Sequence, residues 1–395
     1  MLRIATPDDI KSGKVTDVYF ARTAEILRAK GVDKRVRAEF IVKGFPQGWD
    51  WAILAGLEEV VEVLKDRPVT LRAFPEGTPF RTFQPVLEIE GRYLDFGVLE
   101  TALLGLVCQA SGIATKAARC RNLAGERGVV SFGARRMHPA IAPMIERNAY
   151  VGGCDGVAVV LSAEMLGEAP MGTMPHALIL LFGDTVAAAK AFDEVVEPAI
   201  RRVALIDTFQ DEKFEAIRAA EAMGKKLFGV RLDTPGSRRG SFYRILEETR
   251  WELNLRGFEH VKLFVSGGID EAEIEQLNPF VDAYGVGTSI SNAPVVDFAM
   301  DIIEIDGLPA AKRGKMSGSK QVHRCGRCGS DAVLPRDAPV PACRACGGPT
   351  APLLVEVIRN GKLLAPYPSS QEVRARVLEA LKRPPIAERQ ETGQH

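Results

Sequence analysis

Two glycine-rich turns, each following a short apolar run, are the first feature of this chain that points to chemistry. They are Ser266-Gly267-Gly268 and Gly285-Val286-Gly287-Thr288, and they follow the runs 261–265 and 281–284. Glycine lets backbone N–H groups approach an anion closely, and such loops after the last strands of a (β/α) barrel often bind phosphate. A tight strand-to-helix connection would explain either turn alone. Two in succession favour a phosphate site.

Charged side chains cluster where the ends of the other predicted strands should lie. Arg135, Arg136, Asp207, Arg231 and Asp233 follow apolar runs, Asp155 follows Gly152-Gly153-Cys154, and His176 precedes an apolar run. Because parallel barrels place their active sites at the carboxyl ends of the strands, we expect these residues to meet at one barrel mouth. Guanidinium groups suit carboxylate or phosphate, carboxylates suit ribose hydroxyls or Mg²⁺, and the imidazole can titrate. Taken singly, each is more often an ordinary loop, cap or structural residue.

Four of the seven cysteines form two C-x-x-C pairs, Cys325 with Cys328 and Cys343 with Cys346. This spacing predicts a zinc site, and the closed set of four thiolates predicts that the zinc is structural. Arg324, Arg327 and Arg344 could offset the negative charge of the cluster. A nucleic-acid-binding zinc ribbon is the main non-enzymatic alternative. It is disfavoured because no aromatic residues are interleaved with the arginines and the net charge is zero.

The apolar runs that must position these residues alternate with helical patterns. The predicted strands are 129–132, 156–159, 177–182, 203–206, 227–230, 261–265 and 281–284. Repeated strand–helix units form parallel sheets, and seven of them fit a (β/α) barrel, complete or short by one strand. A doubly wound open sheet is the alternative, which the lack of an early G-x-G-x-x-G motif disfavours.

The segments outside the barrel have a different pattern. We predict an α/β chain with an α+β domain at 1–115, completed by about 295–322 and 352–366, a barrel at 116–294, a zinc module at 323–350, and a C-terminal helix and tail at 367–395. The apolar segment 99–118 predicts a buried helix joining the first two domains. A capping-box pattern at 369–372 begins the last helix, and the polar tail after Pro384-Pro385 is predicted to be disordered.

Composition limits the class of protein. The chain has 395 residues, 46% of them hydrophobic, and its 51 Lys and Arg residues balance 51 Asp and Glu residues. No overall field attracts nucleic acid or a membrane, so any anion must be bound locally. The N-terminus has neither a signal-peptide nor a transit-peptide pattern, and no apolar run is long enough for a membrane span. We expect a cytoplasmic protein that binds neither nucleic acid nor membrane.

The motifs taken together resemble a known family. The segments 131–136, 152–156, 172–176, 207–209, 230–234, 265–269 and 285–288 occur in the order seen in nicotinate phosphoribosyltransferase, in the shorter archaeal type with a C-terminal cysteine metal site. The resemblance implies a type II phosphoribosyltransferase fold, with an incomplete barrel of about seven strands packed on an α+β domain. It also implies a homodimer with shared active sites. The implied reaction joins nicotinate to phosphoribosyl pyrophosphate, giving nicotinate mononucleotide and pyrophosphate in NAD biosynthesis.

The resemblance also implies roles for single residues. Phe132 and the partner subunit's Tyr19 would stack on the pyridine, and Arg135 would pair with its carboxylate or a nearby phosphate. Arg136 would also bind substrate. Ser266, Gly267, Gly268, Gly287, Thr288 and the fork of Arg231 would hold the phosphates. Asp233 would hold ribose hydroxyls, and Asp155 would also bind substrate. Asp207 would help to bind Mg²⁺ or the ribose.

His176 aligns with the histidine that family members phosphorylate when ATP hydrolysis is coupled to the reaction. The resemblance therefore implies ATP as a co-substrate. Two departures from the family pattern bear on this step: Pro175 precedes His176, and Phe209-Gln210 replaces the usual Tyr-Asp.

Two enzymatic alternatives stay open. Quinolinate phosphoribosyltransferase shares the fold and the sugar substrate but also decarboxylates its pyridine, would want more convergent basic residues around that ring, and lacks the zinc module. Nicotinamide phosphoribosyltransferase differs in the pyridine substituent alone.

Overall fold

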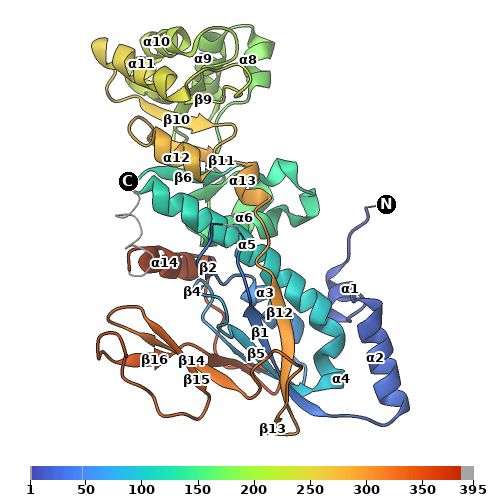
Figure 1. The fold of residues 1–395 in the computed structure, drawn as a ribbon. Coiled ribbons are helices and arrows are strands. Elements are labelled where there is room, and N and C mark those ends of the chain that lie inside the picture. The colour runs from blue at the N-terminus through green and yellow to red at the C-terminus, as the bar shows by residue number, and fades with distance from the viewer. Residues whose placement is uncertain (1, 47, 384–395) are drawn as a thin grey trace. The chain divides into compact units, whose positions relative to one another are not determined.

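The computed structural model describes residues 2–46 and 48–383 (Figure 1). The chain divides into two compact units, Met1–Thr115 with Pro294–His395, and Lys116–Ala293. The predicted disordered tail lies outside the described residues.

The first unit is built on a seven-stranded sheet in the order β13-β12-β1-β5-β3-β17-β18, in which all neighbours are antiparallel. Its strands are β1 (Arg35–Val42), β3 (Thr70–Ala73), β5 (Leu87–Arg92), β12 (Phe298–Ile305), β13 (Leu308–Pro309), β17 (Val355–Arg359) and β18 (Lys362–Leu363). A three-stranded sheet, β15-β14-β16, and a two-stranded one, β2-β4, complete the unit. Their strands are β14 (Lys320–Cys325), β15 (Asp331–Pro335), β16 (Thr350–Pro352), β2 (Ala52–Ile53) and β4 (Pro79–Phe80).

The helices of this unit are α1 (Pro7–Lys11), α2 (Val18–Ala29), α3 (Leu57–Leu64), α4 (Tyr93–Phe96), η1 (Gly97–Leu99), the start of α5 (Glu100–Ala124) and α14 (Ser370–Leu381). Helix α14 begins at the predicted capping box, where Ser369 and Glu372 cap each other's backbone, and it buries Val373, Val377 and Leu381.

Helix α5 confirms the predicted apolar helix and extends it to Ala124. Within the described ranges, the helical run Tyr93–Ala124 is the one segment long and apolar enough to cross a membrane on length and composition alone. Half of its most apolar window is buried, as in the core helix of a soluble protein, so this feature is weak evidence for a membrane span.

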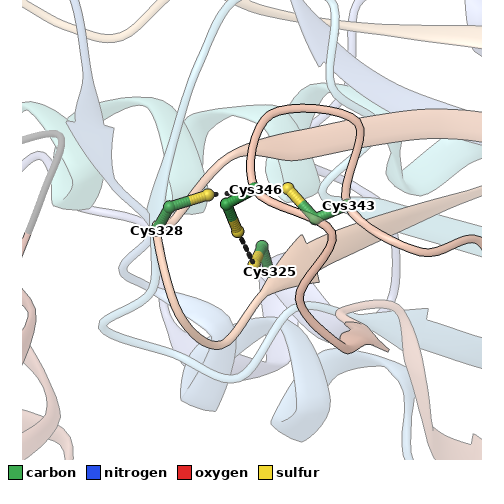
Figure 2. Close-up of side chains that lie close together, drawn as sticks. All are labelled: Cys325, Cys328, Cys343 and Cys346. Carbon is green, nitrogen blue, oxygen red and sulfur yellow. Dashed lines mark hydrogen bonds between the residues drawn. The ribbon is translucent and has the colours of Figure 1, made fainter.

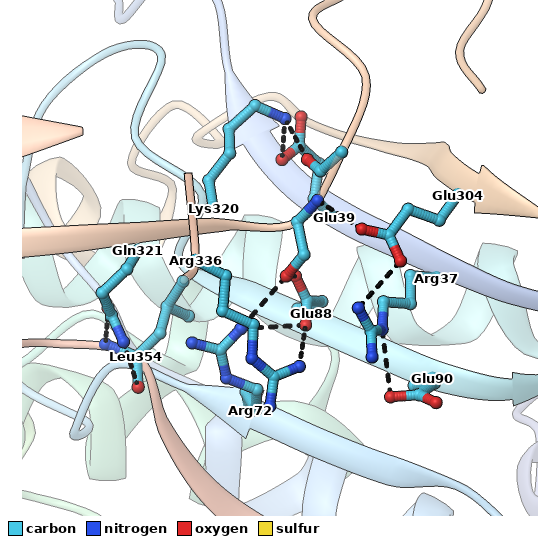
Figure 3. A network of polar contacts seen from close by, with 12 residues as sticks. Arg37, Glu39, Arg72, Glu88, Glu90, Glu304, Lys320, Gln321, Arg336 and Leu354 are labelled. Atoms are coloured by element: carbon cyan, nitrogen blue, oxygen red, sulfur yellow. Dashed lines mark hydrogen bonds and ion pairs between the residues drawn. The ribbon is translucent and has the colours of Figure 1, made fainter. Parts of the chain in front are cut away.

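A row of buried charges crosses the large sheet (Figure 3). In register, Glu39 of β1 lies opposite Asp301 of β12 and Glu88 of β5, and Glu88 lies opposite Arg72 of β3. Arg72 binds Glu88 at 2.9 Å, and the Lys320 ammonium binds Glu39 at 2.9 Å. Burial raises the pKa of Glu39, although Lys320 opposes that shift. Because neighbouring carboxylates repel one another, the stability of this face of the sheet depends on the arginine and lysine side chains that pair with them.

The second unit contains a curled parallel sheet in the order β7-β6-β11-β10-β9-β8. Its strands are β6 (Gly128–Ser131), β7 (Gly156–Val157), β8 (Arg202–Leu205), β9 (Leu227–Leu232), β10 (Lys262–Ser266) and β11 (Ala283–Val286). In chain order the strands run round a circle, with β11 returning to pair with β6, and the circle is open between β7 and β8. The sheet is therefore a half-barrel, which agrees with the predicted incomplete barrel.

The helices around the half-barrel are α6 (Ala142–Val151), α7 (Val160–Leu166), α8 (His176–Phe182), α9 (Thr185–Val195), α10 (Glu212–Met223), α11 (Phe242–Leu255), α12 (Glu271–Leu277) and α13 (Thr288–Ser291), with 3-10 turns η2 (Ala134–Arg136), η3 (Pro139–Ile141) and η4 (Gly224–Lys226). Helix α12 lies between the two glycine turns, as the predicted alternation of strands and helices requires, and Asp270 caps it.

The predicted strand 177–182 is wrong. This segment forms helix α8, which follows Pro175 and ends at Gly183 with a φ of 73°. In the helix only Ile179 is buried, whereas Leu181 is 87% exposed. The described residues therefore form six barrel strands, and the missing one would have stood at the opening between β7 and β8.

Candidate active site

A pocket of about 820 Å³ lies at the carboxyl ends of the half-barrel strands. The loops after β6, β9, β10 and β11 contribute to it, as does the segment 172–177. The predicted site residues among its lining are Phe132, Arg135, Arg136, His176, Arg231, Asp233, Ser266, Gly267, Gly268, Gly287 and Thr288. These residues gather because parallel strands bring their carboxyl ends to one edge of the sheet.

Arg231, Ser266 and Asp233 form a connected set of hydrogen bonds. The Nε of Arg231 donates to the Ser266 hydroxyl at 2.9 Å, and that hydroxyl donates to Oδ1 of Asp233 at 2.7 Å. The Nη2 of Arg231 lies 3.4 Å from Oδ2 of Asp233. The serine, at the end of β10, thus fixes a guanidinium group and a carboxylate from the end of the neighbouring strand β9 in one orientation.

His176 lies beside two carboxylates at the start of α8. Its Nδ1 is 3.1 Å from the Thr208 hydroxyl, and its Nε2 is 3.6 Å from Asp233 and 3.9 Å from Asp207. The His176 side chain is 39% exposed and reaches the pocket. The Thr208 contact sets which ring nitrogen faces the carboxylates.

Asp207 follows β8 and lies behind the pocket lining. Its Oδ2 accepts a hydrogen bond from the backbone N–H of Asp233 at 3.2 Å, while its Oδ1 is buried without a hydrogen-bond partner among the described residues. Burial raises the pKa of Asp207, and the nearby Asp233 carboxylate adds to the shift while His176 opposes it. A buried carboxylate oxygen without a donor suits a cation, and with Asp233 it offers the oxygen ligands that Mg²⁺ prefers.

Both glycine turns need glycine, for different reasons. Gly267 and Gly268 have φ values of 85° and 73°, which side chains other than glycine rarely adopt. A Cβ on Gly268 would meet no atom within 4 Å, so open space lies beside this backbone. A Cβ on Gly285 would lie 2.4 Å from the Phe132 ring, so that glycine makes room for the aromatic side chain.

The aromatic and basic side chains of the pocket are arranged around Phe132. The guanidinium of Arg231 lies 5.5 Å from the centre of this ring. Arg135 and Arg136 belong to η2, are exposed, and have no ion-pair partner among the residues that the structure describes. The pocket therefore brings three guanidinium groups together, and two of them form no ion pair with a described residue.

Two predicted site residues lie elsewhere. Asp155 comes before β7 rather than after it, and its carboxylate accepts hydrogen bonds from Arg121 at 2.8 Å and from the Val129 N–H at 2.9 Å. This places it at the amino ends of the strands, where it stabilises the sheet, and argues against the predicted role in substrate binding. Tyr19 lies on α2 of the first unit, where it is 57% exposed and packs on Phe20.

Three residues at the site were not among the predicted ones. Thr173 accepts a hydrogen bond from Arg231 at 2.8 Å, and Thr208 contacts His176. Glu146 is fully buried and accepts from the N–H groups of Ala158 and Val159, each at 3.0 Å, which fixes the turn after β7. Thr173 and Thr208 lie inside the motif segments, whereas nothing in the sequence near Glu146 marks it.

The four predicted cysteine ligands meet in the first unit (Figure 2). Their sulfur atoms lie within 4.8 Å of one another, and two pairs are 3.5 Å apart. A tetrahedral zinc site with Zn–S bonds of about 2.3 Å places its sulfur atoms about 3.8 Å apart, so the cluster fits one metal ion. Arg324, one of the three arginines expected to offset the charge of the cluster, is paired with Asp331 at 2.7 Å.

Comparisons with known proteins identify the family. The family model for the quinolinate phosphoribosyl transferase N-terminal domain matches residues 17–111, and the model for the C-terminal domain matches residues 113–301. The chain belongs to the quinolinate phosphoribosyltransferase family. This membership agrees with the predicted type II phosphoribosyltransferase relationship.

Individual relatives differ in their similarity to the chain. The solved structure of nicotinate-nucleotide pyrophosphorylase from Pyrococcus furiosus is 54% identical, with a TM-score of 0.95 over 96% of this chain and 98% of that one. A nicotinate phosphoribosyltransferase of Mycobacterium tuberculosis is 29% identical over 78% of this chain and 74% of its own length. The human nicotinic acid phosphoribosyltransferase structure shares the fold, with a TM-score of 0.77 over 93% of this chain and 94% of that one at 24% identity.

These findings overturn the prediction that the chain is a nicotinate phosphoribosyltransferase. The 54% identical structure is a nicotinate-nucleotide pyrophosphorylase, whereas the nicotinate phosphoribosyltransferases of Mycobacterium tuberculosis, Bacillus subtilis and mammals are 26–29% identical. The motifs that led to the wrong prediction lie at strand ends, and the resemblance implies that these strand ends bind the sugar pyrophosphate. Enzymes that use different pyridine substrates but the same sugar pyrophosphate can share those motifs.

Proposed function

We propose that this protein is a nicotinate-nucleotide pyrophosphorylase, that is, a quinolinate phosphoribosyltransferase. It would join the pyridine nitrogen of quinolinate to the anomeric carbon of phosphoribosyl pyrophosphate, displacing pyrophosphate. The carboxylate at C2 would then leave as CO₂, giving nicotinate mononucleotide. The observation that carries the proposal is the 54% identity to a nicotinate-nucleotide pyrophosphorylase over 98% of that chain.

The pocket suits a substrate with several negative charges. Gly267, Gly268, Gly287 and Thr288 would hold phosphate through backbone N–H groups, with Arg231 as a guanidinium fork. Phe132 would stack on the pyridine, and Arg135 and Arg136 would each pair with one of its two carboxylates. A quinolinate enzyme is expected to have more basic residues around the pyridine. Arg135 and Arg136, which pair with no carboxylate of the described residues, meet this expectation.

The transfer step needs charge stabilisation more than acid–base catalysis. As the bond from the anomeric carbon to pyrophosphate breaks, positive charge develops on the ribose, and the Asp233 carboxylate would stabilise it. Asp207 and Asp233 would also hold Mg²⁺, which when bound neutralises charge on the leaving pyrophosphate. The buried free oxygen of Asp207 supports this assignment.

The decarboxylation follows from the product of the first step. With a ribosyl group on its nitrogen, the ring is a pyridinium cation. When the bond to the C2 carboxylate breaks, its electron pair stays on C2 beside the positive nitrogen, and C2 then takes up a proton. Loss of CO₂ makes the two-step reaction irreversible, so ATP hydrolysis is not needed to drive it. ATP coupling through His176 was expected for a nicotinate phosphoribosyltransferase. In the enzyme proposed here, His176 would instead help to orient Asp233.

We further propose a cytoplasmic homodimer in which the partner subunit's Tyr19 completes the aromatic clamp. The exposure of Tyr19 leaves its ring available for this contact.

A radiochemical assay tests the function. The protein is incubated with phosphoribosyl pyrophosphate, Mg²⁺ and quinolinate labelled in the C2 carboxylate, with and without ATP. We expect one labelled CO₂ per nicotinate mononucleotide, at the same rate with and without ATP. Parallel reactions contain nicotinate or nicotinamide in place of quinolinate. Turnover of either of these with none of quinolinate would overturn the proposal.

A further inference from the structure

A second cavity, of about 510 Å³, lies in the first unit. Its walls come from the segment 75–81, the turn 324–329 beside the cysteine cluster, and helix α14. No residue of the half-barrel lines it, so it is separate from the candidate active site and independent of the function proposed above. Its volume falls in the range of small-molecule sites.

The lining of this cavity is rich in arginine. Five of its side chains are Arg81, Arg324, Arg327, Arg376 and Arg383, against the two carboxylates of Asp331 and Glu379. A metal ion held by four thiolates would add two negative charges nearby, and the lining would still keep an excess of positive charge.

Two of the arginines are already paired with carboxylates. Arg324 donates to both oxygens of Asp331, at 2.7 and 2.8 Å, and Arg383 binds Glu379 at 2.8 Å. These two pairs use both carboxylates of the lining.

The other three arginines have no carboxylate within ion-pair distance among the residues that the structure describes. Arg376 donates one N–H to the backbone carbonyl of Glu76, and the guanidinium groups of Arg81 and Arg327 have no hydrogen-bond partner there. Guanidinium groups on three different elements that converge on one cavity without acidic partners match the requirements of a phosphate group.

The rest of the lining is partly apolar. Trp51, Pro75, Pro79, Phe80 and Leu353 contribute to it, and Trp51 and Phe80 are themselves buried. An inorganic ion would leave these apolar side chains without a contact, whereas an organic phosphate with a flat apolar portion would cover them. We propose that this cavity is a second ligand site, which binds a nucleotide-sized organic phosphate.

The test uses full-length protein and AMP as the probe, measured by equilibrium dialysis. We expect wild-type protein to bind AMP at this site and the double variant Arg81→Ala/Arg327→Ala to lose it, with affinity lower by about tenfold or more. Adenosine, which lacks the phosphate, should not bind there, and inorganic phosphate should compete only weakly. Ala380→Glu, which adds a negative charge from α14 without removing an arginine, should have the same effect as the double variant.

Matched controls separate this site from the active site and from a loss of folding. Arg359→Ala removes an exposed arginine on the same unit, and AMP binding should be unchanged. Arg136→Ala should reduce phosphoribosyl transfer but keep AMP binding at the second site. Each variant is checked by melting temperature and metal content. Wild-type AMP binding in both the folded double variant and Ala380→Glu, or equal binding of adenosine and AMP, would overturn the proposal.

Discussion

Ser266 is the residue on which the geometry of the proposed active site depends most directly. Its hydroxyl is acceptor to Arg231 and donor to Asp233, so it joins the group proposed to bind phosphate to the group proposed to stabilise the ribose. Hydrogen bonds to charged partners contribute more than those between neutral groups. The residue was predicted from its place in a glycine turn, but its bridging role appears only when β9 and β10 are side by side.

Ser266→Ala should therefore lower kcat/KM for phosphoribosyl transfer by about 10- to 100-fold, which corresponds to the loss of roughly 1.5–3 kcal/mol. The matched control is Ser289→Ala, which also lines the pocket but makes no hydrogen bond of this kind. Steady-state kinetics of both folded variants measure the effect. Equal kcat/KM values for the two variants would show that the bridge has no role.

Glu100 provides a test of pH dependence at the residue scale. Burial at the start of α5 raises the pKa of Glu100 to about 7, and the Asp301 charge adds to the shift while Lys312 opposes it. Because the folded state holds this proton up to about pH 7 and the unfolded state releases it near 4.5, stability falls as the pH rises between these values. Above about pH 7 the folded protein no longer gains stability from the protonated Glu100 carboxyl.

Glu100→Gln should be more stable than the wild type at pH 8 by about 1–2 kcal/mol, allowing for solvent screening of a partly exposed group. The gain should disappear at pH 4. Urea unfolding at both pH values measures it, with Glu259→Gln as the control at an exposed position. A gain of equal size at pH 4 and pH 8 would contradict the assigned cause.

At the scale of elements, the strand ends explain how much of the site could be predicted. Residues at the carboxyl ends of parallel strands meet at one edge, so Arg231 and the glycine turns could be located from the order of apolar runs, whereas Phe132 was implied by the family resemblance. Asp155 could not, because a residue that precedes a strand looks similar in sequence but lies at the opposite edge. Helix α8 was misread because a short apolar run fits a strand and a helix equally, and its exposure is a tertiary property.

The turn after β10 contains the backbone proposed to hold phosphate. Gly268→Val should fold, since the left-handed backbone costs only about 1–2 kcal/mol and no atom blocks the new Cβ. The added methyl groups would occupy the space proposed for phosphate, so the apparent affinity for phosphoribosyl pyrophosphate should fall by about tenfold or more. Gly257→Val is the matched control: Gly257 also has a positive φ and open space, but it lies after α11 outside the pocket. Unchanged sugar-pyrophosphate affinity in Gly268→Val would remove this turn from the site.

At the scale of the whole molecule, the balanced charge leaves anion binding to local features. The half-barrel pocket and the second cavity are both local concentrations of arginine in a chain with no net charge. The family could be predicted from sequence because its motifs follow one another in order along the half-barrel. The pyridine substrate could not be predicted, because quinolinate and nicotinate differ by one carboxylate and the pairing state of Arg135 and Arg136 is visible only in the folded pocket.

The cysteine cluster tests how far the small β15-β14-β16 sheet depends on a metal ion. Cys325 ends β14, and Cys343 and Cys346 come just before β16, so one bound ion would add a link between two strands that already pair side by side. Protein purified without chelator should contain about one zinc per chain, and Cys343→Ser should lower both the zinc content and the melting temperature. Cys108→Ser, which alters a half-buried cysteine outside the cluster, should keep the zinc. Elemental analysis and thermal melts of the three proteins decide the matter: wild-type protein free of zinc, or a Cys343→Ser variant with the wild-type melting temperature, would show that the sheet is stable without the metal.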